Sequence, residues 1–123
     1  MSFKDEESFR GWLIEVKYYR KSHGRIGIGT SNGEGFQTEI LMKKPAYIEK
    51  HMMWVLANED DKCLFLSNDD IRKNCAGGKI ELGKQNNLSN NVFNKNESKL
   101  IDIRNIPTKI KDWIMKFEVY PIF

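Results

Sequence analysis

The sequence predicts an α/β or α+β fold, with a central mixed sheet of about five strands flanked by helices. Aromatic and branched residues dominate residues 9–20, a composition that is typical of a β-strand. Two apolar runs at 52–57 and 62–66 are joined by a short acidic turn, which predicts a β-hairpin. After Pro107, apolar residues recur at the i, i+3, i+4 and i+7 spacing of one helix face. Strands and helices therefore share the chain, and their apolar faces have to pack in layers.

The first half of the chain also predicts a second strand and a broken helix. Residues 25–30 are a strand candidate whose glycines indicate a twisted edge or a close approach between two backbone segments. Residues 36–44 predict a short helix. Pro45 ends that helix because proline lacks a backbone donor, and residues 46–51 resume it.

The second half of the chain begins with a capped helix. Ser67 and Asp70 have the spacing of a capping box, which predicts a helix that extends through Asn74. A glycine pair then breaks this helix, and we expect residues 79–82 to form a brief strand. The stretch 85–96 is rich in asparagine, so we expect it to be a loop.

All these elements fit within one domain of 123 residues. Residues 100–106 alternate in character and predict an edge strand ahead of the C-terminal helix. Along the chain we expect a motif hairpin at 1–30, a helix and hairpin at 36–74, an Asn-rich loop at 83–98, and a strand and helix at 100–118.

The composition is that of an ordinary globular protein with a mildly basic balance. Charged residues make up 30% of the chain and hydrophobic residues 40%. The net charge of +3 is compatible with nucleic-acid binding. The sequence has two cysteines, too few for a disulfide framework, and it contains no signal peptide, membrane-spanning run or lipidation motif. We therefore expect a cytoplasmic protein without a membrane partner, in which Cys63 is a small buried hydrophobic residue.

Glu15 and Lys17 form the most informative pair in the sequence. Side chains alternate between the two faces of a strand, so these two charges share one face. The opposite face is wholly apolar or aromatic, and we expect it to enter the core: it consists of Trp12, Ile14, Val16 and Tyr18. Two charges on a half-buried face are costly, which favours a functional role. The simpler alternative is a pair of solvated surface charges that contributes little.

A carboxylate and an ammonium group on one strand suit metal-dependent cleavage of a phosphodiester bond. Glu15 offers the oxygen ligands that Mg²⁺ prefers. Lys17 offers a cation that positions the attacking water and offsets charge on the phosphate. Such a site needs a second carboxylate, and Asp5 is ten residues upstream of Glu15. A short hairpin would bring Asp5 to the end of the strand.

Asp5, the run Ile14-Glu15-Val16-Lys17 and the basic stretch 18–25 together resemble the PD-(D/E)XK nuclease superfamily. This is the fold of many type II restriction endonucleases and Holliday-junction resolvases. The resemblance covers residues 3–72 and includes the later order of helix, strand and strand. It implies a restriction-endonuclease-like sheet, with Asp5 and Glu15 as ligands of Mg²⁺ or Mn²⁺ and Lys17 as the catalytic cation. It also implies a homodimer that hydrolyses both strands of DNA.

The sequence departs from the family pattern in two places. Lys4 precedes Asp5 where the family has a proline. The family begins with a helix and a strand ahead of the aspartate, whereas this chain begins four residues before Asp5. These departures leave three alternatives open: a trimmed core, a second subunit that supplies the missing layer, or a domain that has lost catalysis.

Basic and polar residues near the motif predict a surface that contacts nucleic acid. Cations after the strand attract phosphates, although a charged turn can equally keep an edge strand soluble. The glutamine that opens the following helix is of the residue type that assists the metal site in nucleases of this resemblance. The predicted contact residues are Arg20, Lys21, His23, Arg25, Gln37, Lys43 and Lys44.

Two other classes of function stay open from the sequence. One is a catalytically inactive nuclease-fold domain that binds nucleic acid or protein. The other is a small α+β interaction or immunity protein, in which Glu15 and Lys17 are solvated. Convergence of Asp5, Glu15 and Lys17 in space would distinguish the nuclease fold from the second alternative.

Overall fold

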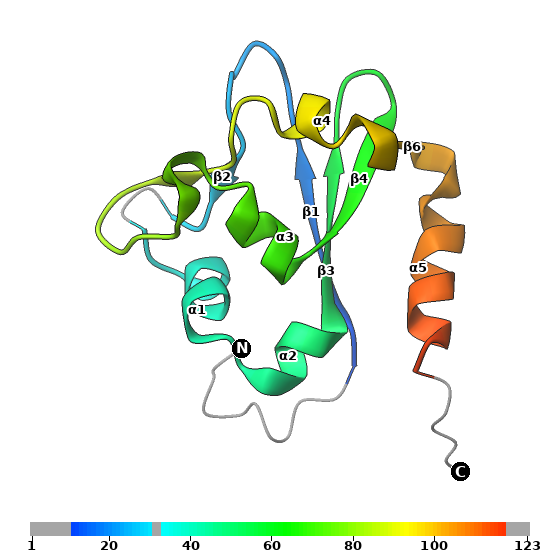
Figure 1. Ribbon diagram of the computed structural model, residues 1–123, viewed down its shortest axis with the longest axis horizontal. Coiled ribbons are helices and arrows are strands. Elements are labelled where there is room, and N and C mark those ends of the chain that lie inside the picture. Colours follow the sequence, from blue (N-terminus) through cyan, green and yellow to red (C-terminus); the bar gives the residue numbers. More distant parts are fainter. Residues whose placement is uncertain (1–10, 31–32, 118–123) are drawn as a thin grey trace.

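The computed structural model describes residues 11–30 and 33–117, in which helices cover both faces of a mixed sheet (Figure 1). Four strands pair in the order β1 (Leu13–Tyr18), β3 (Met52–Ala57), β4 (Lys62–Ser67) and β6 (Ile101–Asp102). Strands β1 and β3 are parallel, and the other two pairs are antiparallel. The predicted α+β class is confirmed, with four strands rather than about five in the main sheet of the described residues.

The remaining strands form a separate pair rather than extending the main sheet. Strand β2 (Gly27–Ile28) is antiparallel to β5 (Asn86–Asn87), which falls inside the predicted loop. The predicted strand at 79–82 is absent. In its place, the Asn86 side chain accepts a hydrogen bond from the Glu81 N–H at 2.8 Å and donates one to the Glu81 carbonyl at 2.9 Å. A buried side-chain amide thus satisfies the backbone groups that a neighbouring strand would have paired.

Two other segments near the C-terminus also differ from the prediction. The Asn-rich stretch contains a short helix α4 (Val92–Lys95), because its apolar residues anchor it to the core, and a 3₁₀ turn η3 (Glu97–Lys99) follows it. The predicted edge strand is only two residues long. Directly after it, the Asp102 carboxylate accepts a hydrogen bond from the Arg104 N–H at 2.9 Å and starts the 3₁₀ turn η4 (Ile103–Asn105).

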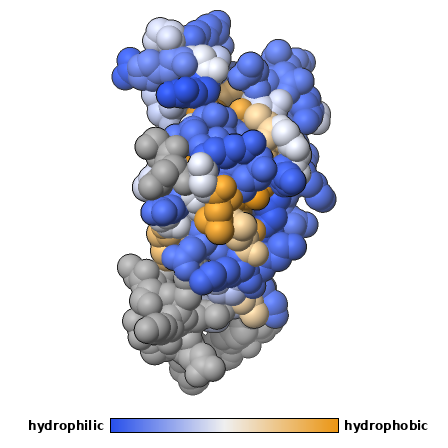
Figure 2. Space-filling model, turned by 90° about the vertical axis from the view of Figure 1, so that its left-hand side faces the viewer, coloured by the Kyte–Doolittle hydropathy of each residue, from blue (hydrophilic) through white to orange (hydrophobic). Residues whose placement is uncertain are grey.

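Three helices and a short turn lie over one face of the sheet. They are α1 (Phe36–Lys43), α2 (Ala46–His51), α3 (Asn68–Lys73) and the 3₁₀ turn η2 (Ala76–Gly78). The predicted capping box is confirmed: Ser67 Oγ accepts from the Asp70 N–H, and Asp70 Oδ2 accepts from the Ser67 N–H, both at 3.1 Å. These helices and the sheet enclose the main core, in which Trp54, Leu56 and Leu64 are fully buried. The outer surface seen in Figure 2 is largely hydrophilic, with a small apolar patch.

Helix α5 (Ile106–Met115) covers the opposite face of the sheet (Figure 1). Its Trp113 ring lies edge-on to Phe65 of β4, with 6.0 Å between the ring centroids. Beneath it is a small cluster of buried residues from β3 and β4: Val55, Ala57 and Cys63. Both cysteines of the chain are buried free thiols, as expected for Cys63.

The prediction that the even-numbered face of β1 enters the core is wrong for three of its four residues, whereas Ile14 is half-buried and packs against the small cluster beneath α5. Val16 is 63% exposed, Tyr18 is 50% exposed and Trp12 is 42% exposed. Strand β1 lies at one edge of the sheet, and α5 packs mainly over β3 and β4. The odd-numbered face of β1 instead lies on the main core side, where Leu13 and Tyr19 pack.

A polar network ties the helices to the sheet beneath them. Arg72 of α3 donates to Glu49 of α2 at 2.6 Å and to the Leu41 carbonyl of α1 at 2.8 Å. Asn68 donates to the same Glu49 oxygen at 2.8 Å and accepts from the Trp54 indole N–H at 2.6 Å. Only 14% of the Arg72 side chain is exposed, so water cannot replace these bonds freely.

Replacing Arg72 with methionine should lower the free energy of unfolding by about 3 kcal/mol, because it leaves a mostly buried carboxylate without its cation. Urea denaturation of Arg72→Met measures this change. Arg104→Met is the matched control, since it removes an arginine–carboxylate pair in which the arginine side chain is 86% exposed. The control should change stability by less than about 1 kcal/mol. Equal losses in the two variants would contradict the role given to the network.

Candidate active site on strand β1

Glu15 and Lys17 lie on the face of β1 that the helices cover. Glu15 is in register with Trp54 of β3, and Lys17 is in register with Leu56. Both neighbours are fully buried, whereas the two charged side chains are half-buried. The pair is therefore placed next to the main core, but on an edge strand where solvent and a ligand can still reach it.

Burial changes the acid–base behaviour of Lys17. Loss of hydration lowers the pKa of its ammonium group from the ordinary value of 10.5, and the negative charge of Glu15 partly opposes that shift. The lowered pKa makes the ammonium group a better proton donor than a solvated lysine. A desolvated cation beside a carboxylate is also the kind of arrangement found at sites that bind or transfer charge.

Glu15 supplies the one carboxylate of the predicted motif within the described part of the chain. Its oxygens suit a hard divalent cation such as Mg²⁺. The second predicted ligand, Asp5, lies outside the described residues. Within residues 11–30 and 33–117, no three histidine, cysteine, aspartate or glutamate side chains are grouped closely enough to hold a metal ion.

A basic turn follows β1 directly. Four predicted contact residues are exposed on this segment: Arg20, Lys21, His23 and Arg25. The His23 N–H donates to the Arg20 carbonyl at 2.9 Å and closes the turn. The Lys21 N–H donates to the Glu59 carboxylate at 2.8 Å, which fastens the basic turn to the turn between β3 and β4. The structure thus holds the cationic segment at the carboxyl ends of two parallel strands.

The other predicted contact residues lie on α1, away from the basic turn (Figure 1). The Gln37 carbonyl oxygen accepts from the Gly29 N–H at 3.0 Å, so this side chain fixes the loop before the helix. Gly29 has φ +73°, and a Cβ there would lie 2.8 Å from the Glu34 carbonyl oxygen. The close backbone approach predicted from the glycines is confirmed at this position. Lys43 pairs with Glu39 at 3.0 Å, and Lys44 ends the helix in the left-handed conformation.

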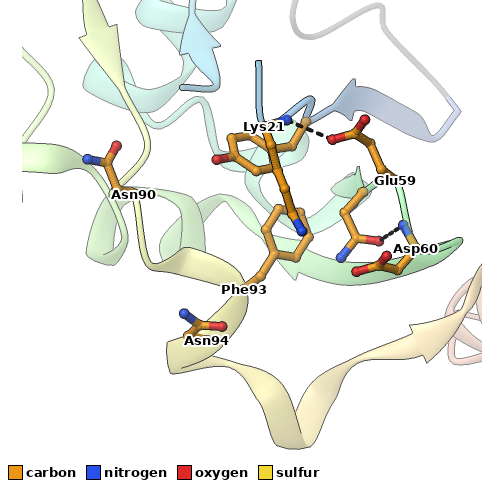
Figure 3. Close-up of a pocket in the computed structure, with 8 residues that line it drawn as sticks. Lys21, Glu59, Asp60, Asn90, Phe93 and Asn94 are labelled. Carbon is orange, nitrogen blue, oxygen red and sulfur yellow. Dashed lines mark hydrogen bonds between the residues drawn. The ribbon is translucent and has the colours of Figure 1, made fainter. Parts of the chain in front are cut away.

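A pocket that the sequence did not indicate lies beside the basic turn (Figure 3). Its volume is about 340 Å³. The lining residues come from the ends of β1 and β3 and from the segment around α4: Tyr19, Lys21, Asn58, Glu59, Asp60, Asn90, Phe93 and Asn94. The asparagines of the 85–96 stretch are the only sequence signal for it, and their composition predicts a loop rather than a pocket.

Comparisons with known proteins leave this site to be interpreted from its own geometry. No protein-family model, curated protein or solved structure matches the chain. In addition, none of the helices in the described residues combines the length and the apolar character needed to span a membrane.

The lowered pKa of Lys17 predicts a pH-dependent stability difference between the wild type and Lys17→Met. The folded state releases the Lys17 proton at lower pH than the unfolded state, so this residue's contribution is most favourable above pH 10.5 and is lost as the pH falls through the folded-state pKa. Lys17→Met should therefore gain stability relative to the wild type at pH 7, and the gain should shrink by pH 10.

Chemical denaturation of both proteins at the two pH values measures the gain. Lys111→Met, which replaces an exposed lysine of α5, corrects for the general effect of losing a positive charge. A stability difference that is the same at both pH values would show that burial does not perturb Lys17.

Proposed function

We propose that the protein is a metal-dependent endonuclease that hydrolyses phosphodiester bonds of DNA. Glu15 is the metal-binding carboxylate within the described residues, and Lys17 is the catalytic cation. The basic turn after β1 holds the phosphate backbone of the substrate. Asp5 is proposed as the second metal ligand from the sequence pattern alone.

One observation carries this proposal: Glu15 and Lys17 share the helix-covered face of an edge strand, and burial lowers the pKa of Lys17. Among residues 11–30 and 33–117 no strand pairs with the outer side of β1, so that side is available to a nucleic-acid strand within this part of the chain. Partial burial reduces the screening of Lys17 by water, so its charge acts more strongly on a phosphate than a solvated lysine would.

The residues of the chain have separate parts in the reaction. Lys17 orients the attacking water and stabilises negative charge that grows on the phosphate oxygens. The negative charge of Glu15 favours the charged form of Lys17, because it opposes the effect of burial on the pKa of that lysine. A divalent cation, when bound at Glu15, supplies Lewis-acid activation of water. A homodimer would place two such sites on one duplex.

The nearby cations favour an anionic polymer as substrate. Arg20, Lys21, His23 and Arg25 are exposed on one turn at the carboxyl end of β1, directly after Lys17. Arg20 also lies over the Tyr18 ring, with 5.2 Å from its guanidinium carbon to the ring centroid, so its side chain has a defined orientation. Phosphates along a nucleic-acid strand would bridge this turn and the Glu15–Lys17 pair.

Nicking of supercoiled plasmid in the presence of Mg²⁺ or Mn²⁺ tests the proposal. Glu15→Gln and Lys17→Met keep the approximate shapes of the side chains, and each should slow cleavage at least about 100-fold. Asp112→Asn and Lys111→Met are matched controls on α5, which covers the opposite face of the sheet, and they should cleave like the wild type.

The cleavage assay, combined with a DNA-binding assay, also distinguishes the two alternative functions: an inactive nuclease-fold domain and an interaction domain. Plasmid that stays intact with a folded protein, together with metal-independent binding of DNA, would indicate an inactive nuclease-fold domain. A folded protein that neither cleaves nor binds nucleic acid would favour an interaction domain instead.

A further inference from the structure

The pocket beside the basic turn combines aromatic and polar side chains in a way that the cleavage chemistry does not use (Figure 3). Its volume of about 340 Å³ lies at the small end of the range for small-molecule sites. It therefore suits a single ring-sized group rather than an extended ligand. Its walls come from segments far apart in the sequence, which the fold brings together.

Two aromatic rings form the apolar part of the pocket. Tyr19 and Phe93 contact each other with 5.8 Å between their centroids and a tilt of 40°. Both are half-buried and pack against the main core, so their positions are fixed. Because the rings already touch, a planar ligand cannot insert between them. It can stack against the exposed part of this pair.

Several polar groups at the pocket have no partner within the described residues. Asn90 and Asn94 are exposed, and no side-chain hydrogen bond holds either amide in the described parts of the chain. The Lys21 ammonium and the Asp60 carboxylate also lack an ion pair there. By contrast, Glu59 is occupied by the Lys21 N–H. The pocket thus offers amide donors and acceptors, one cation and two carboxylates next to the aromatic surface, and one of these carboxylates already accepts a hydrogen bond.

The pocket and the proposed catalytic pair lie along the same face of β1. Tyr19 follows Lys17 by two residues, so the two side chains point to the same side of the sheet about 7 Å apart. The Tyr19 N–H donates to the Ala57 carbonyl at 2.8 Å and continues the pairing of β1 with β3 beyond the strand. The pocket therefore opens at the carboxyl ends of two parallel strands, where α/β sheets commonly bind ligands.

From these observations we propose that the pocket binds one unpaired nucleobase of a nucleic-acid strand. The base stacks on the Tyr19–Phe93 pair, and Asn90 and Asn94 form hydrogen bonds with its edge. Lys21 contacts the adjoining phosphate. The inference rests on the proposed function only in placing this base on the strand that Glu15 and Lys17 act on.

The cations of Lys21 and the adjacent basic turn favour a nucleotide over another ring-sized ligand such as a sugar. A neutral sugar could stack on the rings and bond to the amides, but it would leave Lys21 and the adjacent basic turn without a role. A nucleotide uses all three kinds of group: rings for its base, amides for the base edge, and cations for its phosphates. In a duplex the bases are stacked and paired, so entry into the pocket requires an unpaired base.

Fluorescence anisotropy with labelled 12-nucleotide single strands in EDTA tests the inference without cleavage. Phe93→Leu keeps an apolar side chain on the core, and Asn94→Ala changes an exposed residue, so both variants should fold. Each should weaken binding at least about fivefold, as expected for the loss of base stacking or of a base-edge contact. Asn105→Ala, an exposed asparagine next to α5, should bind like the wild type.

A strand of the same length with abasic sites separates base contacts from phosphate contacts. Phe93→Leu and Asn94→Ala should not weaken binding of this abasic strand. Equal weakening for the normal and abasic strands, or no weakening for either, would overturn the inference. Base-dependent binding in EDTA would stand even if no plasmid cleavage occurred, and in that case the proposed endonuclease activity alone would fail. Cleavage that requires Glu15 and Lys17, without base-dependent binding, would overturn the base-binding pocket and leave the proposed endonuclease activity standing.

Discussion

The contact between Arg72 and Glu49 holds the helical layer in place over the sheet. Through Arg72, α3 is joined to α2 and to the last turn of α1, and through Asn68 the same carboxylate is linked to Trp54 of β3. Trp54 is the register partner of Glu15. The partly buried Glu49 carboxylate and its partner Arg72 therefore link three short helices to the strand beside the candidate site. Helices of six to eight residues are not stable alone, so their positions depend on such tertiary contacts.

The Glu15–Lys17 pair lies on the same face of the sheet as the Arg72–Glu49 network. Unlike that network, the pair is unfavourable for packing on this face. The neighbouring positions on β3 are filled by fully buried apolar side chains, whereas Lys17 loses hydration without a short hydrogen bond to offset that loss within the described residues. An apolar residue there would suit the core better. Local sequence choices that conflict with packing are characteristic of functional sites, and this conflict supports the proposal that Lys17 serves chemistry rather than stability.

The sequence was most informative where a local signal decides the structure. The strand at 52–57, the hairpin that follows it and the Ser67 capping box were predicted correctly, because apolar runs, turns and caps are set by neighbouring residues. The sequence was misleading where contacts between distant residues determine which side chains are buried. The even-numbered face of β1 is the more apolar one, yet Trp12, Val16 and Tyr18 are exposed, because β1 lies at the edge of the described sheet and α5 packs mainly over β3 and β4. The Glu15–Lys17 pair was predicted as a unit, but the pocket was not, since Tyr19 and Phe93 meet only through the fold.

The parallel pairing of β1 and β3 explains why these features gather at one end of the molecule. Parallel strands direct their carboxyl ends to the same edge, so the basic turn after β1 and the acidic turn after β3 meet there. The hydrogen bond from the Lys21 N–H to Glu59 joins the turn after β1 to the turn after β3. The segment around α4 completes the wall of the pocket with Phe93. An antiparallel arrangement would have placed the two turns at opposite ends of the sheet. The direction of a single edge strand thus determines whether a phosphate near Lys17 and a base near Phe93 can belong to the same nucleic-acid strand.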